Sequence, residues 1–392
     1  MHILTFNIMR SFIFLVGLVS ASPAVLRPRQ HDGHGSSPMS TSALPQAPSS
    51  VWSPVKAETL KPQDTRPGVK RVRYTIGPFK LNPSGYKRQM YEGQMDPNSD
   101  VFKGPLTGIP KNIVVLQTNS SFINEDGSPA DIANGLYNHH FIVADANKMG
   151  PSPLKCIDGG ANNTTPKNMG LLMGASEANK DMIFSSSKNL TTGFIVGAND
   201  TVIVSAELVN YNNATKTVYL QSELEFQNVT SDALDTNFFQ FDINMCNPAK
   251  PDLVAPPGQK KWSVTSKKVE VAQNGYILFR RGHMHDGGES VELRLNDKPV
   301  CISTAHYGGE LGTATINGET WETISRMEPC LDPVQVKVGD FLTVTGNFDL
   351  AAHKSRQHSH GSGMGEQMAL MTKAFKHIIN QCWHLSMLWT SC

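Results

Sequence analysis

Short runs of β-branched and aromatic residues dominate this 392-residue chain from about residue 66 onward, and turn-forming residues separate them. Val, Ile, Thr, Phe and Tyr favour strands, whereas Gly, Asn, Asp and Pro end them. Long helical patterns are scarce. The sequence therefore predicts an all-β fold. The clearest expected strands lie at 112–117, 140–144, 201–209, 217–226, 276–279, 290–295, 334–338 and 341–345.

A Pro-rich stretch at 248–259 divides these runs into two groups. It predicts a linker between two tandem antiparallel β-sandwich domains of jelly-roll-like type, at 66–247 and 260–373. Residues 25–65 are rich in Pro and Ser and predict a disordered lead-in. The segment 374–392 does not continue the strand pattern, so it is either a short amphipathic helix or an artefact of the gene model.

The first residues have the pattern of a secretory signal peptide, assigned to 1–24. Arg10 precedes the apolar run 11–19, and small residues follow it with a plausible cleavage point after Ala21 or Ala24. The run is too short to span a bilayer. We therefore expect a secreted, extracellular protein with no membrane span.

Seven Asn-x-Ser/Thr sequons fall in one region of the chain, which predicts an exposed, glycosylated surface. The acceptors are Asn119, Asn162, Asn163, Asn189, Asn199, Asn213 and Asn228.

Six cysteines form an even set, which fits disulfides in an oxidising compartment. We expect Cys301 to pair with Cys330. Cys382 and Cys392 lie in the doubtful tail and are discounted, and the remaining connectivity stays open.

The charge of the chain is close to balanced, with 35 Lys plus Arg and 34 Asp plus Glu. A nucleic-acid-binding surface is strongly basic. Nucleic acid is therefore not the expected partner.

His283 and His285 follow an apolar, aromatic run at 275–279 that predicts a strand. Alternate strand residues share a face, so two imidazoles can point to one place. Converging neutral imidazoles are the start of a transition-metal site. A solvated pair of histidines is the alternative.

Met364 and Met368 offer a different kind of ligand near the end of the second expected domain. A strand carrying Met368 can lie beside the His283–His285 strand. A thioether with two imidazoles suits copper, above all Cu(I), better than zinc. The alternative is that Met in an apolar strand fills the core.

His139 and His140 are adjacent in a second expected strand. Neighbours on a regular strand point to opposite faces, so both can bind one metal only at a strand end or a bulge. The alternative is one buried, hydrogen-bonded histidine and one solvated histidine.

Together these motifs resemble the ascorbate-dependent type II copper monooxygenases, the peptidylglycine α-hydroxylating monooxygenase superfamily. Asn138-His-His-Phe-Ile-Val143 is similar to that family's first copper element, Arg281-Gly-His-Met-His285 to its second, and Gly365-Glu-Gln-Met-Ala-Leu370 to its thioether segment. The chain also resembles the secreted, stress-up-regulated Nod19-like proteins. The resemblance implies copper at His283, His285 and Met368, a further copper at His139 and His140, and ascorbate as reductant.

The chain departs from the family pattern at two places. Asn210 stands where the family has the third histidine of the first copper site, so this site is either weak or completed by a residue from elsewhere. Thr372 replaces a substrate-binding tyrosine, which disfavours a peptidyl-glycine substrate. Arg281 and His353 do match family positions on the substrate side.

Three functions follow from these patterns. The first is a copper monooxygenase that hydroxylates a C–H bond with dioxygen. The second is a non-catalytic, secreted copper-binding or stress-associated protein with a degenerate first site. The third is a sandwich whose histidines serve adhesion or glycan contact. Ascorbate-dependent oxygen consumption separates the first two, and failure to bind Cu(I) favours the third.

Overall fold

A computed structural model describes residues 44–377, apart from 95, 150–151, 158–167, 169, 176–179, 187–191, 248–252, 310–311, 317–318 and 355–367. This part of the chain is built almost entirely of antiparallel strands, with two short 3-10 turns, η1 (Ile132–Asn134) and η2 (Ala146–Lys148). No helix in the described residues is long and apolar enough to cross a membrane. The prediction of an all-β sandwich fold is confirmed.

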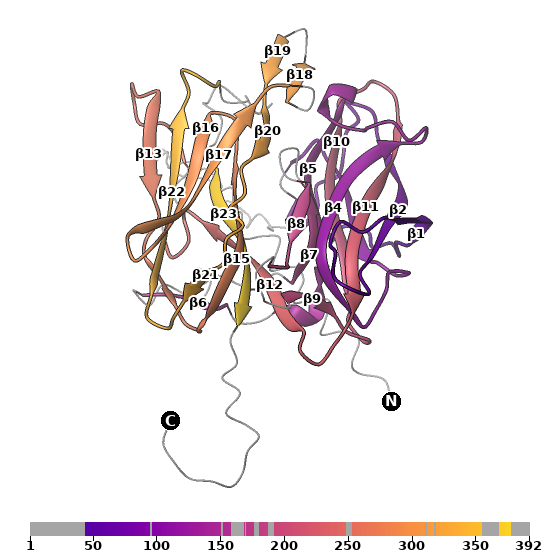
Figure 1. Cartoon of the computed structure of the whole chain (residues 1–392). Coiled ribbons are helices and arrows are strands. Elements are labelled where there is room, and N and C mark those ends of the chain that lie inside the picture. The colour runs from indigo at the N-terminus through magenta and orange to yellow at the C-terminus, as the bar shows by residue number, and fades with distance from the viewer. Residues whose placement is uncertain are drawn as a thin grey trace, which may run out of the picture.

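The largest sheet has ten strands and runs through both halves of the molecule (Figure 1). A short parallel pairing of β9 with β12 joins its two parts. In sheet order its main path is β1 (Pro54–Leu60), β2 (Lys70–Leu81), β11 (Lys216–Asn228), β4 (Ile113–Asn124), β9 (Thr192–Val196), β12 (Leu234–Asp242), β23 (Ala369–His377), β15 (Gly275–Met284) and β21 (Val334–Val336), while β8 (Asp181–Ile183) pairs with β4.

A four-stranded sheet packs against the first part of this sheet and completes the first sandwich. Its order is β3 (Asp100–Pro105), β10 (Val202–Asn210), β5 (Leu136–Asp145) and β7 (Leu171–Ala175).

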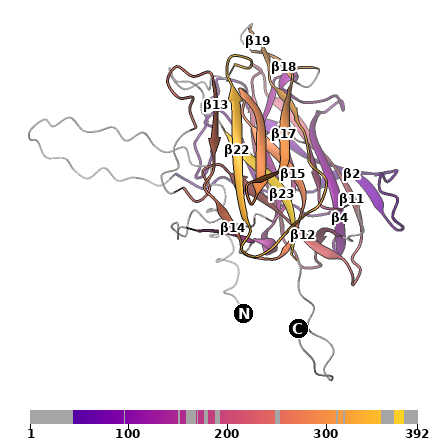
Figure 2. The ribbon, with the colours of Figure 1, turned by 60° about the vertical axis from the view of Figure 1, so that its left-hand side comes forward.

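A seven-stranded sheet completes the second sandwich, and its strands run nearly vertically in Figure 2. A separate hairpin, β18 (Thr313–Ile316) with β19 (Glu319–Glu322), approaches η1 of the first half. The order of the sheet is β20 (Ile324–Met327), β17 (Lys298–Tyr307), β16 (Gly288–Leu295), β22 (Phe341–Asp349), β14 (Val269–Val271) and β6 (Leu154–Cys156), while β13 (Lys261–Thr265) pairs with β22.

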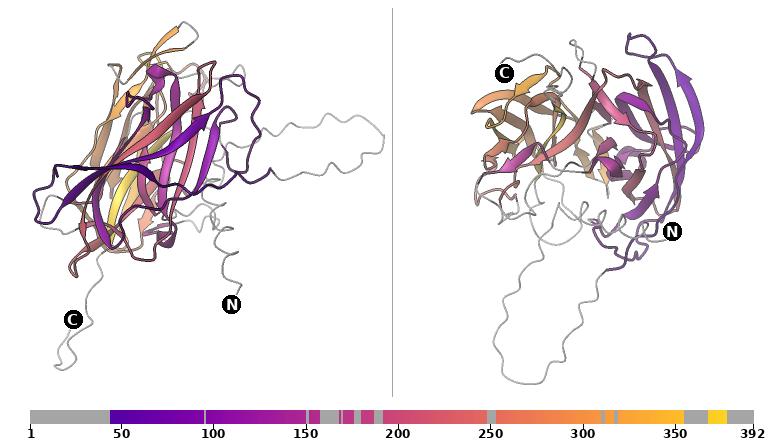
Figure 3. Two further views of the ribbon diagram at one scale, coloured as in Figure 1. Left: turned by 90° about the vertical axis from the view of Figure 1, so that its right-hand side faces the viewer. Right: turned by 90° about the horizontal axis from the view of Figure 1, so that it is seen from below.

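Alternation of apolar residues explains why these segments form sandwiches. From 218 to 224 in β11 the buried side chains are Val218, Leu220, Ser222 and Leu224, every second residue, and those between them are only half-buried. Residues of this spacing share one face of a sheet, and covering that face removes apolar surface from water. Each sandwich encloses its own core, and the two sandwiches lie side by side when seen from below (Figure 3).

Two strands from the first part of the sequence belong to the second sandwich. β12 pairs with β23, and β6 pairs with β14. A disulfide between Cys156 in β6 and Cys246, shortly after β12, ties these two segments together. The halves are therefore interlocked as well as joined end to end.

The structure differs from expectation at both ends of the described region. β1 lies within 25–65, which the sequence analysis assigned to a disordered lead-in. It is ordered because it pairs with β2 and because the ring of Trp52 stacks on Phe79 with 4.5 Å between ring centres. At the other end β23 continues to His377, beyond the expected boundary at 373, because its backbone pairs with β12 and β15.

The predicted disulfide between Cys301 and Cys330 is confirmed. Cys382 and Cys392 lie outside the described residues. Of the sequon residues, Asn119, Asn199, Asn213 and Asn228 are exposed, while Asn162, Asn163 and Asn189 lie outside the described residues. Glycosylation stays a prediction.

A buried acid ends the strand that carries the adjacent histidines. Asp145 is inaccessible to solvent, and its Oδ1 accepts a hydrogen bond from the backbone N–H of Asn147. Burial, and then the neighbouring Asp200, raise the pKa of Asp145 to about 6. Folding therefore favours the protonated carboxyl group relative to the unfolded chain. The resulting contribution to the free energy of unfolding is complete below about pH 4 and is lost as the pH rises through 6.

The substitution Asp145→Asn keeps a neutral side chain at every pH. We expect it to raise the free energy of unfolding at pH 7 by about 1–3 kcal/mol, with little difference from the parent protein near pH 4. Urea unfolding at both pH values measures the effect. An equal change at the two pH values would contradict this account.

Candidate metal centres

A bulge in β5 brings both adjacent histidines to the same side of the four-stranded sheet. β5 pairs with β10 so that His140 lies opposite Glu207 and Asn138 lies opposite Leu208. His139 is therefore the extra residue of a bulge, which breaks the usual alternation of faces. The rings of His139 and His140 lie 5.5 Å apart between centres. The geometric condition that the sequence imposed on a shared metal site is thus met.

Glu207 joins these two histidines. Its Oε2 lies 3.4 Å from Nδ1 of His139, and its Oε1 lies 3.7 Å from Nε2 of His140. One ligand atom from each of the three residues lies within 4.8 Å of the others, so the three side chains could hold a metal ion together. We call His139, His140 and Glu207 the first centre.

The first centre has the charge states that metal binding needs. Burial, helped by the charges of His139 and Lys103 and opposed by that of Glu207, lowers the pKa of His140 to about 4. Burial alone would raise the pKa of Glu207, but the imidazole of His139, the charge of His140 and the backbone N–H of Asp96 together lower it. A neutral imidazole therefore faces an ionised carboxylate at neutral pH.

Asn210 lies at the C-terminal end of β10, where its side chain binds backbone groups and not the histidine pair. Its Nδ2 donates to the carbonyl oxygens of Asn82 and Ala214, at 3.1 and 2.8 Å, and its Oδ1 accepts from the backbone N–H of Asn212 at 3.0 Å. Its amide thus orders the turn after β10. The residue that the structure brings to the histidine pair is Glu207, three positions earlier.

Sequence reasoning missed Glu207. The signal that could have found it is a single acidic residue inside the otherwise apolar run 201–209. A buried carboxylate in such a strand requires a partner. Which partner it meets depends on the register between β10 and β5, which the sequence does not reveal.

β15 carries the second group and is buried on both faces. Gly282 and Met284 face the core of the second sandwich. Phe279 belongs to the core of the first sandwich, and the guanidinium of Arg281 binds the side chain and the backbone carbonyl of Asp181 in β8. His283 shares the face of Phe279 and Arg281, so it looks toward the first half.

His283 and His285 together form what we call the second centre. Their rings are nearly perpendicular, with 6.1 Å between ring centres. Two imidazoles on one ion have ring centres roughly 5–6 Å apart, given metal–nitrogen bonds of about 2.1 Å, so a small approach of the two rings would bring them to a shared ion. Burial, and then the charges of His285, His139 and Arg281, lower the pKa of His283 to about 3. His283 is therefore neutral at pH 7, as a metal ligand must be.

The two centres lie on facing surfaces of the two halves. The charge of His139 is among the groups that lower the pKa of His283, so the imidazoles are within electrostatic reach. β5, β7 and β8 lie in the middle of the molecule, next to β15 and β23 (Figure 1). Between the sandwiches the rings of Phe184, Phe238 and Phe279 form a continuous apolar contact.

The methionine predicted as third ligand follows the same register. β23 pairs with β15 so that Leu370 lies opposite His283 and Ala369 opposite Met284. Met368, which is half-buried, directly precedes this pairing, and extending the register by one residue would bring it opposite His285. Residues opposite each other in an antiparallel pair share a face. Met364 lies outside the described residues.

His353 supports the turn after the second centre rather than extending it. Its ring stacks on Tyr307, with 3.5 Å between ring centres. The Tyr307 hydroxyl accepts from the backbone N–H of Gly287 at 2.9 Å and donates to the carbonyl of Gly288 at 2.8 Å. This stack therefore orders the residues directly after His285.

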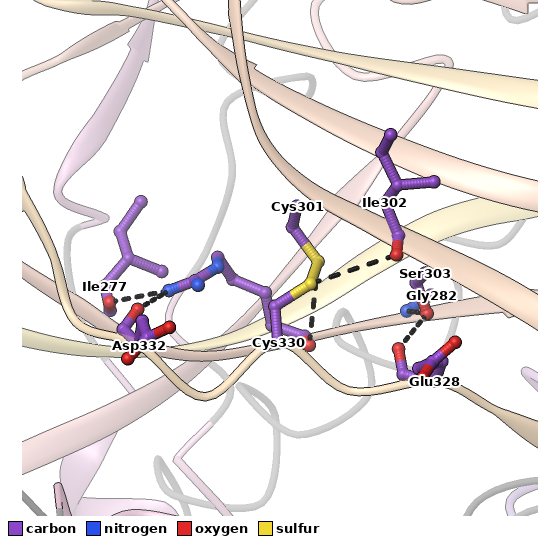
Figure 4. Close-up of a disulfide and its surroundings, with 9 residues drawn as sticks. Ile277, Gly282, Cys301, Ile302, Ser303, Glu328, Cys330 and Asp332 are labelled. Carbon is purple, nitrogen blue, oxygen red and sulfur yellow. Dashed lines mark hydrogen bonds between the residues drawn. A yellow bond between two sulfur atoms is a disulfide. The ribbon is translucent and has the colours of Figure 1, made fainter.

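The Cys301–Cys330 disulfide anchors β15 just before the histidines (Figure 4). Cys330 and Arg280 exchange two backbone hydrogen bonds, of 2.8 and 3.1 Å. Ser303 accepts from the backbone N–H of Gly282 at 2.8 Å and donates to the carbonyl of Glu328 at 2.6 Å. The covalent link and these bonds hold the strand that presents His283.

Two relatives are distantly similar to this chain. It is 23% identical over 271 residues to the probable copper-dependent oxygenase M1 of a Phoma species, and 23% identical over 273 residues to the probable copper-dependent oxygenase clz3 of Cochliobolus lunatus. The matches cover 67% and 65% of this chain, and 64% and 78% of those proteins, so less than two thirds of the Phoma protein is spanned. These similarities support the predicted resemblance at the level of copper oxygenases.

No protein-family model matches the chain. Among solved structures, the major capsid protein P2 of bacteriophage PM2 aligns with 79% of this chain and 99% of its own, at 11% identity. The TM-score of 0.28 is too low to carry an argument.

The disulfide next to β15 provides a test of how the second centre is held. Replacing Cys301 and Cys330 by Ser opens a loop that spans 29 residues, and chain entropy predicts a loss of about 4 kcal/mol in unfolding free energy. We also expect faster amide hydrogen exchange in the peptide 278–285. The matched control replaces Cys156 and Cys246, which should destabilise the protein without selective exposure of this peptide. Equal exchange in both variants would contradict the anchoring role.

Proposed function

We propose that this chain is a secreted copper-dependent oxidoreductase that hydroxylates a substrate C–H bond with dioxygen, at a copper held by His283, His285 and Met368. The observation that carries the proposal is the second centre itself. The rings of His283 and His285 lie 6.1 Å apart between centres, and extending the register of β23 by one residue beyond its last pair would bring Met368 to the same face. The similarity to proteins named copper-dependent oxygenases supports the same reading.

The donor set fits copper. Two imidazoles with one thioether form a soft site that favours Cu(I), the oxidation state that reacts with dioxygen. Copper bound there would supply the activation of dioxygen. The chain keeps the His283 imidazole neutral through burial, fixes its strand with the Cys301–Cys330 disulfide, and surrounds the strand with packed side chains.

The finer assignment is to the ascorbate-dependent copper monooxygenases, with ascorbate as the external reductant. Within this assignment a peptidyl-glycine substrate is disfavoured. Arg281, which matches a substrate-side arginine of that family, is bound to Asp181 and is 5% exposed. An arginine engaged in this way is not available to hold a substrate carboxylate. We therefore propose a substrate without a terminal carboxylate at this position.

Secretion is part of the proposal. Two disulfides fit an oxidising compartment, and the four sequon residues in the described part of the chain are exposed, as acceptors must be. The N-terminal segment 1–24 has the pattern of a signal peptide and lies outside the described residues.

A non-catalytic copper-binding role is the second candidate. Asn210, which stands where the related family has a histidine, is committed to the turn after β10. A first centre without three histidines differs from the family's electron-donating site. Copper binding without turnover would follow if electrons do not reach the second centre.

Substituting His283 by Ala tests copper binding at the second centre. We expect the variant to bind Cu(I) at least tenfold more weakly, because the loss of a ligand exceeds the loss of a supporting group. Competition with a chromophoric Cu(I) chelator measures the affinity. The matched control is His306→Ala, which removes a histidine that is 43% exposed on β17 and bonded to Arg326. Unchanged Cu(I) affinity in His283→Ala would refute the assignment.

Oxygen uptake then separates the two candidate functions. Copper-loaded protein that consumes dioxygen only with ascorbate and a substrate supports the oxygenase, and His283→Ala should abolish this uptake. Tight Cu(I) binding without uptake for any substrate tried supports the non-catalytic role. Failure of the parent protein to bind copper would sink both.

A further inference from the structure

We propose that Glu207 is the third protein ligand of the first centre, which makes His139, His140 and Glu207 a two-histidine, one-carboxylate site that binds divalent transition-metal ions and disfavours Cu(I). The inference deepens the proposed function by assigning the other centre, and it does not require copper at the second one. The donors, their spacing and their surroundings each support it.

The spacing fits a shared ion better than a hydrogen bond. The contacts of Glu207 with His139 and His140 are 3.4 and 3.7 Å, beyond the usual 2.7–3.2 Å of an N–H···O bond. Ligand atoms on one tetrahedral ion with bonds of about 2.1 Å are roughly 3.4 Å apart. Nδ1 of each histidine is buried and makes no hydrogen bond with any described residue. Each imidazole therefore stands at a ligand-like distance from the carboxylate, beyond an ideal hydrogen bond with it.

The strand geometry selects these three residues. Glu207 lies opposite His140 in the register of β10 with β5, and the bulge adds His139 to the same side. Without the bulge, adjacent histidines would point to opposite faces. A bulge that re-aims a side chain is common beside functional sites. The fold thus provides a specific means of gathering three donors that are not neighbours in sequence.

Hydrogen bonds from the loop at 96–99 hold the carboxylate of Glu207. Glu207 is 1% exposed, and its Oε2 accepts from the backbone N–H of Asp96 at 3.1 Å and from the hydroxyl of Ser99 at 3.3 Å. Supporting hydrogen bonds of this kind orient ligands in metal sites. The site therefore suits a single divalent ion held by one carboxylate.

The donor chemistry separates the two centres. Carboxylate and imidazole are harder ligands than a thioether, and they suit Zn(II), Cu(II) or Fe(II) rather than Cu(I). A carboxylate in place of a third imidazole also stabilises the higher oxidation state of copper. The first centre should therefore retain a divalent ion under reducing conditions in which Cu(I) occupies only the second centre.

The test uses the full-length protein carrying His283→Ala, so that the second centre does not compete. Calorimetric titration of the metal-free protein with Zn(II) should show one site. Adding Glu207→Gln, which keeps the shape and removes the charge, should weaken Zn(II) binding at least 100-fold. In the protein that retains His283, the same Glu207→Gln substitution should change Cu(I) affinity little. Glu225→Gln is the matched control, because Glu225 is an equally buried strand glutamate, also 1% exposed, bonded to Gln63 and Asp64. Zn(II) affinity that is equal in the Glu207 and Glu225 variants would overturn the proposal.

A second measurement guards against a folding defect in the Glu207 variant. In the unsubstituted site, bound Zn(II) should protect His139 and His140 from modification by diethyl pyrocarbonate, and His306 should stay reactive. Equal reactivity of His139 and His140 with and without Zn(II) would also overturn the proposal.

A Glu207-dependent Zn(II) site in a protein that binds no copper would support this inference and refute the proposed function. Copper at the second centre without a Glu207-dependent Zn(II) site would support the proposed function and refute this inference.

Discussion

β15 is covered on both faces, with only Tyr276 and His283 partly accessible to solvent, and this constraint organises the rest of the molecule. Alternate residues of the strand serve two different cores: Gly282 and Met284 pack into the second sandwich, whereas Phe279, Arg281 and His283 face the first. A Cβ atom at Gly282 would lie 2.9 Å from Met327 and from Val291, so the second core allows no larger residue there. A shift of one residue in register would exchange the two faces, so packing fixes which side His283 occupies.

The surface between the halves combines apolar contacts with buried polar groups that require hydrogen-bond or ion-pair partners. Phe184, Phe238 and Phe279 exclude water, which raises the cost of any buried polar group without a partner. Arg281 meets Asp181 across this boundary, and Glu207 meets the histidine pair and the loop at 96–99. Each of these buried polar groups therefore has a partner, either across the boundary between the halves or within the first centre.

Sequence alone predicted those features that depend on local pattern. Alternating residues such as Val218, Leu220 and Leu224 gave the strands, and the spacing of His283 and His285 gave a shared direction. Features that depend on pairing between distant strands could not be obtained this way. The bulge at His139 and the position of Glu207 opposite His140 exist only once β5 and β10 are in register. Likewise, β1 is ordered through its contacts with β2 and through Trp52 on Phe79, although its composition resembles a disordered segment.

The interlocked topology links any metal bound between the halves to their association. β12 and β6 come from the first part of the sequence but pair within the second sandwich, and the Cys156–Cys246 disulfide joins the segments that carry them. The two halves thus cannot separate freely, and His139 and His283 stay within electrostatic reach. An ion that binds the folded state stabilises it by mass action, so metal at either centre would also strengthen the packing around it. In such an arrangement the ligand type would decide which ion each centre takes, while the shared fold keeps the two groups of histidines within reach of each other.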